Sequence, residues 1–177
     1  MKKFLLLAAT AAVVVMSGPT FAQSVGEKSG VNSTLGIAPK TEDFVKEVAI
    51  SDMFEIESSK LAQTKGNAAD KDFAGHMITD HTKTSTELKG LVSGGKVKAD
   101  VPAALDDAHQ KKLDKLKGLN GDDFAKQYNS DQVSAHKDAV NLFERYSKGG
   151  ENADLKAWAG KTLPALQAHL KMAQNLK

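Results

Sequence analysis

The sequence has no cysteine and only one arginine, Arg145. Without cysteine, no disulfide can support the fold and no thiolate can bind zinc, so stability has to come from a packed core. Arginine is the side chain best suited to bidentate phosphate contacts, and its scarcity argues against a nucleic-acid-binding surface. The sequence also lacks a glycine-rich phosphate loop, a nucleophile elbow and any strand-length alternating run. These absences leave helices as the expected structure.

A long apolar run occurs only at the N-terminus. Lys2 and Lys3 precede the apolar residues 4–16, a Ser-Gly-Pro break follows at 17–19, and a small-residue cleavage position ends at Ala22. This pattern predicts a signal peptide over residues 1–22 and a periplasmic or secreted mature protein. The 155 residues that remain of the 177 suit one domain and contain no other membrane-spanning run. Their 22 basic and 22 acidic residues balance, so we expect no nucleic-acid partner.

The mature sequence divides into two parts. Residues 23–40 are rich in glycine and small polar residues and have no apolar period, so we expect a flexible leader there. From residue 41 onward, apolar residues recur at three- and four-residue spacings, with capping residues before the runs and glycines after most of them. This pattern predicts one helical domain over residues 41–177.

Five helices are predicted in that domain, and their connections are brief. Proline inside a helix removes one backbone donor, so we expect a kink at Pro164 in the last of them. Four long helices and one short helix predict an all-α fold, an antiparallel four-helix bundle with one extra short helix. The predicted helices cover residues 41–65, 67–93, 102–117, 122–148 and 152–176.

All five histidines lie in predicted helices. Helical phase places His169 and His109 at the centre of apolar faces and His81 at the border of one, with His136 further round its helix and His76 least inward. Imidazoles and carboxylates from facing helices are suitable ligands for Fe, Mn, Zn or Cu. We therefore consider a mononuclear metal site formed by His81, His136, His169, Asp80 and either Glu57 or Glu55. The alternative is that each histidine is a core residue hydrogen-bonded to a neighbouring helix.

Spacing argues against two more specific sites. A ferritin-type di-iron centre needs a glutamate three residues before a histidine on two helices, and only His109 has an acidic residue, Asp106, at that position. Asp80 and His81 are sequence neighbours that diverge around the helix, so they cannot form a catalytic dyad. Asp80 is expected instead to pair with His76, four residues away, or to cap a contact with the first helix. We assign no catalytic residue.

Four segments together resemble the DUF4142 family of exported bacterial proteins: EIESSKLA at 55–62, FAGHMITDH at 73–81, FAKQYNSDQVSAH at 124–136 and LPALQAHL at 163–170. The resemblance implies a four-helix bundle of the ferritin-like superfamily and carries no established activity. Two positions, Gly75 and Lys126, depart from the family pattern. The positions that look characteristic of the family are Glu57, Met77, Asp80, His81, Tyr128, His136, Pro164 and His169.

The functional expectation is an exported, ferritin-like bundle of a non-catalytic binding or envelope-stress accessory type. Its partner would be another envelope protein, and the chain would be a monomer or a weak oligomer. The alternative is a metal-binding protein, possibly enzymatic, with one divalent ion held by Glu57, Asp80, His81, His136 and His169.

Overall fold

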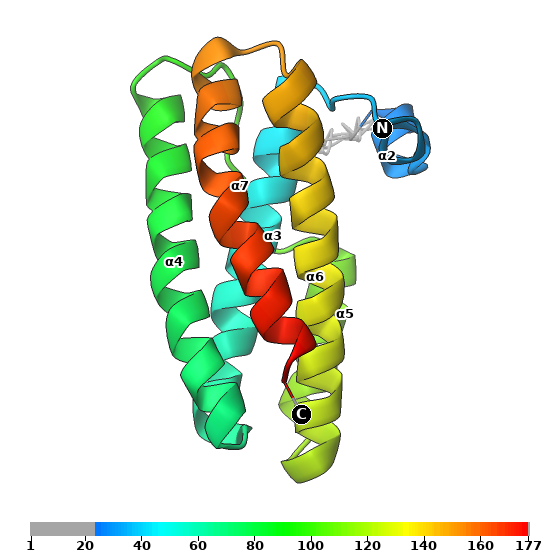
Figure 1. Ribbon diagram of the computed structural model, residues 1–177, viewed down its shortest axis with the longest axis vertical. Helices are drawn as coiled ribbons and strands as arrows, with labels where there is room; N and C mark the ends of the chain where they lie inside the picture. Colours follow the sequence, from blue (N-terminus) through cyan, green and yellow to red (C-terminus); the bar gives the residue numbers. More distant parts are fainter. Residues whose placement is uncertain (1–23, 177) are drawn as a thin grey trace, which may run out of the picture.

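The computed structural model describes residues 24–176, which contain seven α-helices and no β-strand (Figure 1). The predicted signal peptide, residues 1–22, lies outside the described residues. No helix in the described part of the chain combines the length and the apolar character that crossing a membrane requires. The helices are α1 (Val25–Lys28), α2 (Val31–Leu35), α3 (Thr41–Lys65), α4 (Ala68–Ser93), α5 (Asp107–Gly118), α6 (Gly121–Gly149) and α7 (Ala153–Gln174).

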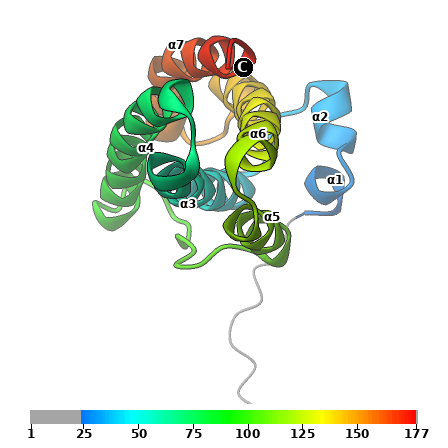
Figure 2. The ribbon, with the colours of Figure 1, turned by 90° about the horizontal axis from the view of Figure 1, so that it is seen from below.

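The four long helices form the bundle. Viewed along its axis, α4 lies between α3 and α7, and α6 closes the ring between α7 and α3 (Figure 2). Neighbouring helices run antiparallel and diagonal helices run parallel, because the connection from α4 returns along the bundle before α6 begins (Figure 1). The short helix α5 lies in that connection and packs outside the ring against α3 and α6 (Figure 2). The predicted all-α bundle with one extra short helix is confirmed.

Local sequence explains where the helices begin. Asn67 and Asp70 form a reciprocal capping box at the start of α4, as predicted. The extra helix was expected from residue 102, but it begins at Asp107. The reason is that the side chain of Asp106 accepts a hydrogen bond from the backbone N–H of His109, which makes Asp106 the N-cap.

The apolar core consists of two separate clusters. The first cluster joins the start of α3 to the end of α6 and the start of α7, and its aromatic centre is Phe44, stacked on Tyr146 with a ring-centroid distance of 4.0 Å. The second cluster joins the end of α3 to the starts of α4 and α6, with Phe73 and Phe124 against Tyr128. Each large apolar side chain buried there contributes about 1.5–3 kcal/mol. The interior between the two clusters is polar.

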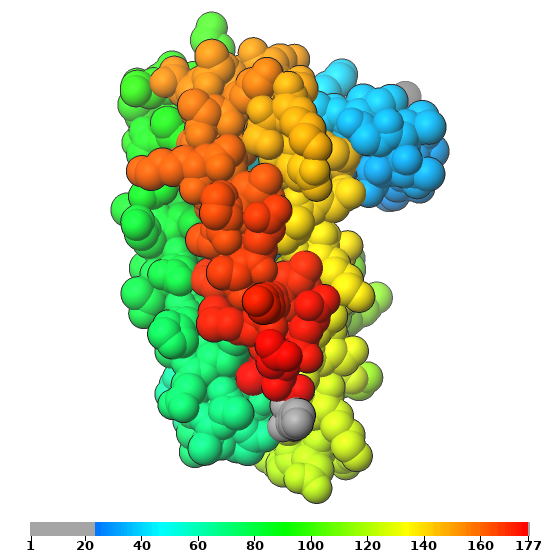
Figure 3. Space-filling view, viewed as in Figure 1, coloured from blue at the N-terminus to red at the C-terminus, as the bar shows by residue number. Residues whose placement is uncertain are grey.

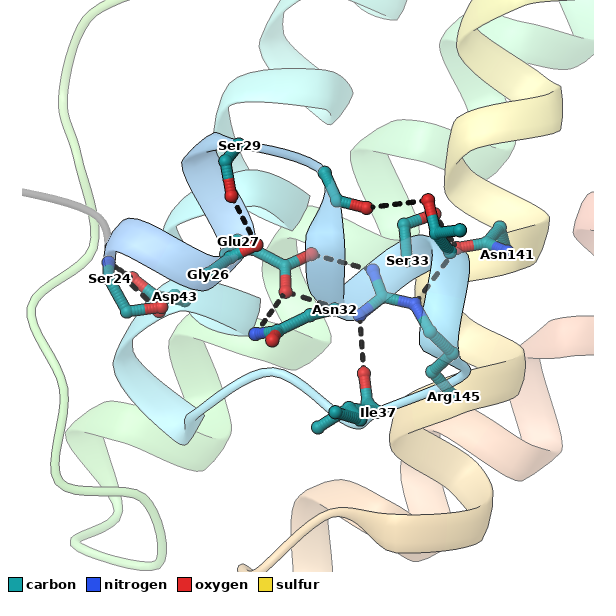
Figure 4. A network of polar contacts seen from close by, with 12 residues as sticks. Ser24, Gly26, Glu27, Ser29, Asn32, Ser33, Ile37, Asp43, Asn141 and Arg145 are labelled. Carbon is teal, nitrogen blue, oxygen red and sulfur yellow. Dashed lines mark hydrogen bonds and ion pairs between the residues drawn. The ribbon is translucent and has the colours of Figure 1, made fainter.

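The segment expected to be a flexible leader holds α1 and α2 instead. Both helices lie against the side of the bundle next to α6, where Figure 3 shows α2 projecting as a separate lobe. The cause is tertiary, because Arg145 of α6 donates hydrogen bonds to the Glu27 carboxylate and to the carbonyl of Ile37 (Figure 4). A second contact joins Ser33 to Asn141. Composition alone does not reveal these partners.

Candidate metal centre

The polar layer between the two apolar clusters receives a buried glutamate or histidine from each long helix. Glu55 comes from α3, His81 from α4, His136 from α6 and His169 from α7, and none is more than 4 % exposed. Ionisable groups are rarely buried this completely unless they are paired or bind a ligand. This layer is therefore the first place to look for function.

Helical periodicity turns the three histidines inward. His81 follows Phe73 and Met77 on one face of α4, at four-residue steps, and both are core residues of the second cluster. His136 lies two turns after the buried Tyr128 on α6. His169 lies three residues after Leu166 and four before Ala173, which are both buried. Each imidazole occupies a position that an apolar core residue would otherwise fill.

An acceptor behind each ring fixes its tautomer. His81 donates from Nδ1 to Asp52 over 2.8 Å, and His169 donates from Nε2 to Asp80 over 2.9 Å. His136 donates from Nδ1 to the backbone carbonyl of Gln132 over 2.9 Å. Since carboxylates and carbonyls only accept hydrogen bonds, these nitrogens carry the protons. The other nitrogen of each neutral ring therefore presents a lone pair.

Those three remaining nitrogens are buried and unpaired. His81 Nε2, His136 Nε2 and His169 Nδ1 have no hydrogen-bond partner among residues 24–176. The ring centroids are 5.5 Å apart in all three pairs, and one ligand nitrogen from each ring lies within 4.8 Å of the other two. When all three rings are neutral, these nitrogens present three lone pairs that cannot hydrogen-bond to one another. A cation can satisfy them together.

The electrostatics of the layer favour neutral imidazoles at two of the three positions. Burial, together with the neighbouring His81, lowers the pKa of His136 to about 3. Burial also lowers the pKa of His169, against the opposing effect of Asp80. For His81, burial lowers the pKa, but the hydrogen bond and charge of Asp52 outweigh it, so the pKa lies above its usual value. Neutral imidazole is the form that binds metals.

Glu55, not Glu57, is the glutamate inside the bundle. Glu57 lies on the surface of α3 and pairs with Lys60. The Glu55 carboxylate lies 3.8 Å from His136 Nδ1, and its burial raises its pKa to about 7. In the structure, Glu55 continues a line of buried positions at three- and four-residue steps, Val48, Asp52, Ser59 and Ala62. Because apolar residues surround most of α3, the sequence alone did not separate Glu55 from Glu57.

The two aspartates of the site act behind the histidines. Asp80 was expected to pair with His76, but it accepts the hydrogen bond of His169, and its side chain is 46 % exposed. Asp52 was not identified from the sequence. It is buried behind His81, and Thr84 and Ser85 donate to its second oxygen. An aspartate on an apolar helix face was the available signal for it.

The other two histidines lie elsewhere. His109 pairs with Asp106 at the start of α5, where its ring packs against Phe54 at a centroid distance of 5.5 Å. His76 is exposed on α4. The structure thus brings together three of the five histidines, with Asp80 one shell further out and Glu57 outside the site.

Three imidazoles from three helices are a sufficient ligand set for a transition metal. Sites with three protein ligands leave a further coordination position for water or substrate. Carboxylates behind the ligating histidines orient the rings and raise their basicity. The layer can therefore hold a single ion without supplying a complete coordination shell.

Comparisons with known proteins place the chain in a family. Searches among curated proteins and among solved structures found no match. The family model described as "Domain of unknown function (DUF4142)" matches residues 26–176, a range that includes α2, the whole bundle and all three inward histidines. The chain belongs to the DUF4142 family.

Proposed function

We propose that the protein binds one divalent transition-metal ion through His81, His136 and His169. Two observations carry this proposal: one ring nitrogen from each of the three buried histidines lies within 4.8 Å of the other two, and one nitrogen of each ring has no hydrogen-bond partner in the described chain. Each unsatisfied buried polar atom costs about 1–3 kcal/mol, so three of them at one point are costly without a ligand. A bound cation converts all three into ligand bonds.

The surrounding charges suit a divalent ion. Asp52 and Asp80 each accept a hydrogen bond from the back of a ligating ring, and the negative charges of the two carboxylates together balance two positive charges. Imidazole ligands favour Zn, Cu, Fe and Ni over the hard cations Mg and Ca, which prefer oxygen. The absence of cysteine removes the thiolates that would otherwise compete for such an ion.

The wider setting is part of the proposal. We place the protein outside the cytoplasm, on the strength of the N-terminal sequence pattern, and we assign its bundle to the ferritin-like class because two antiparallel helix pairs are joined by a long crossover. The role we propose is metal binding without turnover.

Calorimetric titration of the mature protein tests the metal site. After treatment with a chelator, the protein should bind one equivalent of Zn²⁺ or Co²⁺. His169→Ala should weaken binding at least about tenfold, because it removes one of three ligands. His76→Ala removes an exposed histidine from α4 and should leave binding unchanged.

The competing interpretation is that the three histidines are structural core residues of an accessory protein. It predicts that neither the unmodified protein nor His169→Ala binds metal. A folded His169→Ala variant that binds as much metal as the unmodified protein would contradict the proposed site.

A further inference from the structure

We infer that the metal in this site carries an exogenous ligand, a water molecule that small monodentate anions replace, and that Glu55 positions this ligand. The inference rests on the proposed metal site and adds what occupies the coordination position left by the histidines. Glu55 is accordingly a positioning residue and not a fourth protein ligand.

The three histidines do not complete the coordination of a metal ion. Within residues 24–176, the group of side chains whose ligand atoms converge consists of His81, His136 and His169. Zinc and cobalt take at least four ligands, so three imidazoles leave at least one position to a molecule from solution. Buried apolar side chains of both clusters adjoin the layer but cannot fill that position.

The Glu55 carboxylate lies next to the hydrogen-bonded nitrogen of His136. Its Oε1 lies 3.8 Å from His136 Nδ1, the nitrogen that already donates to the carbonyl of Gln132. The nitrogen of this ring that is free for a metal is Nε2. Glu55 is also not among the side chains whose ligand atoms form the group of three.

Glu55 differs from the two aspartates in its hydrogen bonds. Asp52 and Asp80 each accept a hydrogen bond from a ligating ring. Both oxygens of Glu55 are buried and make no hydrogen bond of good geometry, although the amide of Gln132 lies near them. The carboxylate beside the histidines can therefore accept a further hydrogen bond. A metal-bound water has two O–H groups to donate to the oxygens of Glu55.

Cobalt spectroscopy tests this inference directly. The mature protein, loaded with Co²⁺ at pH 8, is titrated with sodium azide while the visible d–d absorption is recorded. We expect a saturable change of the spectrum, because azide replaces the water. Glu55→Gln should raise the affinity for azide at least about tenfold, since it removes a negative charge close to the bound anion.

Glu57→Gln is the matched control. It makes the same chemical change two residues away on α3, at an exposed position, and the azide affinity should equal that of the unmodified protein. Circular dichroism of both variants establishes that they are folded. If Glu55→Gln does not fold, the titration of the unmodified protein still decides whether the site takes an exogenous anion.

The outcomes separate the two proposals. A protein that binds no Co²⁺ overturns both. A cobalt protein whose spectrum does not respond to azide overturns this inference and leaves the metal site standing. If Glu55→Gln weakens Co²⁺ binding about a hundredfold and changes the spectrum without azide, Glu55 is a direct ligand and the inference is wrong.

Discussion

Two buried charged clusters of this protein differ in how completely their polar atoms are satisfied. At the edge of the bundle, Arg145 meets Glu27 with both side chains less than 10 % exposed, and each guanidinium nitrogen donates to an oxygen. In the middle of the bundle, three ring nitrogens have no partner in the described residues, and neither oxygen of Glu55 makes a hydrogen bond of good geometry there. A satisfied buried cluster holds a structure together, whereas an unsatisfied one indicates a ligand.

The two clusters also differ in what they connect. The Arg145 cluster joins the N-terminal helices α1 and α2 to α6, and its residues lie outside the two apolar clusters of the core (Figure 4). The histidine layer joins four helices between the two apolar clusters. Removing a partner from the Arg145 cluster should therefore release only the N-terminal segment. Binding of a metal ion in the histidine layer should stabilise the whole fold.

Metal binding should produce the largest effect. At a free Zn²⁺ concentration about a thousand times the dissociation constant, binding to the folded state alone adds about 4 kcal/mol to the free energy of unfolding. For a domain of this size, that raises Tm by roughly 10 °C. Thermal unfolding with Zn²⁺ and with EDTA measures the difference. An unchanged Tm would mean that the histidine layer, like the Arg145 cluster, has only a structural role and binds no metal.

Arg145→Ala should produce the next largest effect on stability. Removing one member of a buried ion pair leaves Glu27 uncompensated and lowers the free energy of unfolding by about 3 kcal/mol. The loss does not exceed this value, because the N-terminal segment can detach and return Glu27 to water. Hydrogen exchange should lose protection in residues 24–36, while the Zn²⁺ affinity stays the same. A change in Zn²⁺ affinity would show that the two clusters are coupled.

Asp52→Asn should weaken Zn²⁺ binding by roughly 10- to 100-fold, because the buried carboxylate supports His81. Asp80→Asn should have a smaller effect, since half-exposed Asp80 is screened by water. Calorimetric titration measures both, with Asp106→Asn, which pairs with a histidine outside the site, as the control. Equal effects of Asp52→Asn and Asp106→Asn would contradict the proposed role of Asp52.

The pH dependence of the stability of the metal-free protein tests the shifted pKa values of His136 and Glu55. The lowered pKa of His136 means that stability falls as pH decreases from 6.5 toward 3, because the unfolded state binds the proton first. The raised pKa of Glu55 has the opposite effect on stability. Its contribution to the free energy of unfolding is complete below pH 4.5 and is lost as pH rises through 7. Between pH 4.5 and 6.5 the two should largely cancel.

Glu55→Gln removes the contribution of Glu55 and leaves that of His136. In EDTA, this variant should lose stability relative to the unmodified protein by roughly 1 kcal/mol for each pH unit between 6.5 and 4.5. Urea unfolding at several pH values measures the trend, and Glu57→Gln should follow the unmodified protein. Parallel curves for Glu55→Gln and the unmodified protein would mean that Glu55 keeps an ordinary pKa.

The success and failure of sequence reasoning follow from what periodicity encodes. Spacing along a helix gives the direction of a side chain, so His169 was correctly assigned to the centre of an apolar face and His81 to the border of one. Spacing also placed His109 centrally, although its side chain is 29 % exposed, and it placed the buried His136 further round its helix. On α3, apolar residues surround most of the helix, and periodicity could not choose between Glu55 and Glu57. Periodicity could not identify partners on other helices, such as Asp80 for His169.

The sequence by itself determined the all-α class, the four long helices and the inward direction of His169, because these depend on local spacing and capping. The tertiary structure decided that the three imidazoles lie at one level of the bundle, since the axial offset between helices depends on connections and packing. It also decided which ring nitrogens remain free, through Asp52, Asp80 and the carbonyl of Gln132. The docking of α1 and α2 was decided in the same way, because Glu27 meets Arg145 only after the bundle has formed.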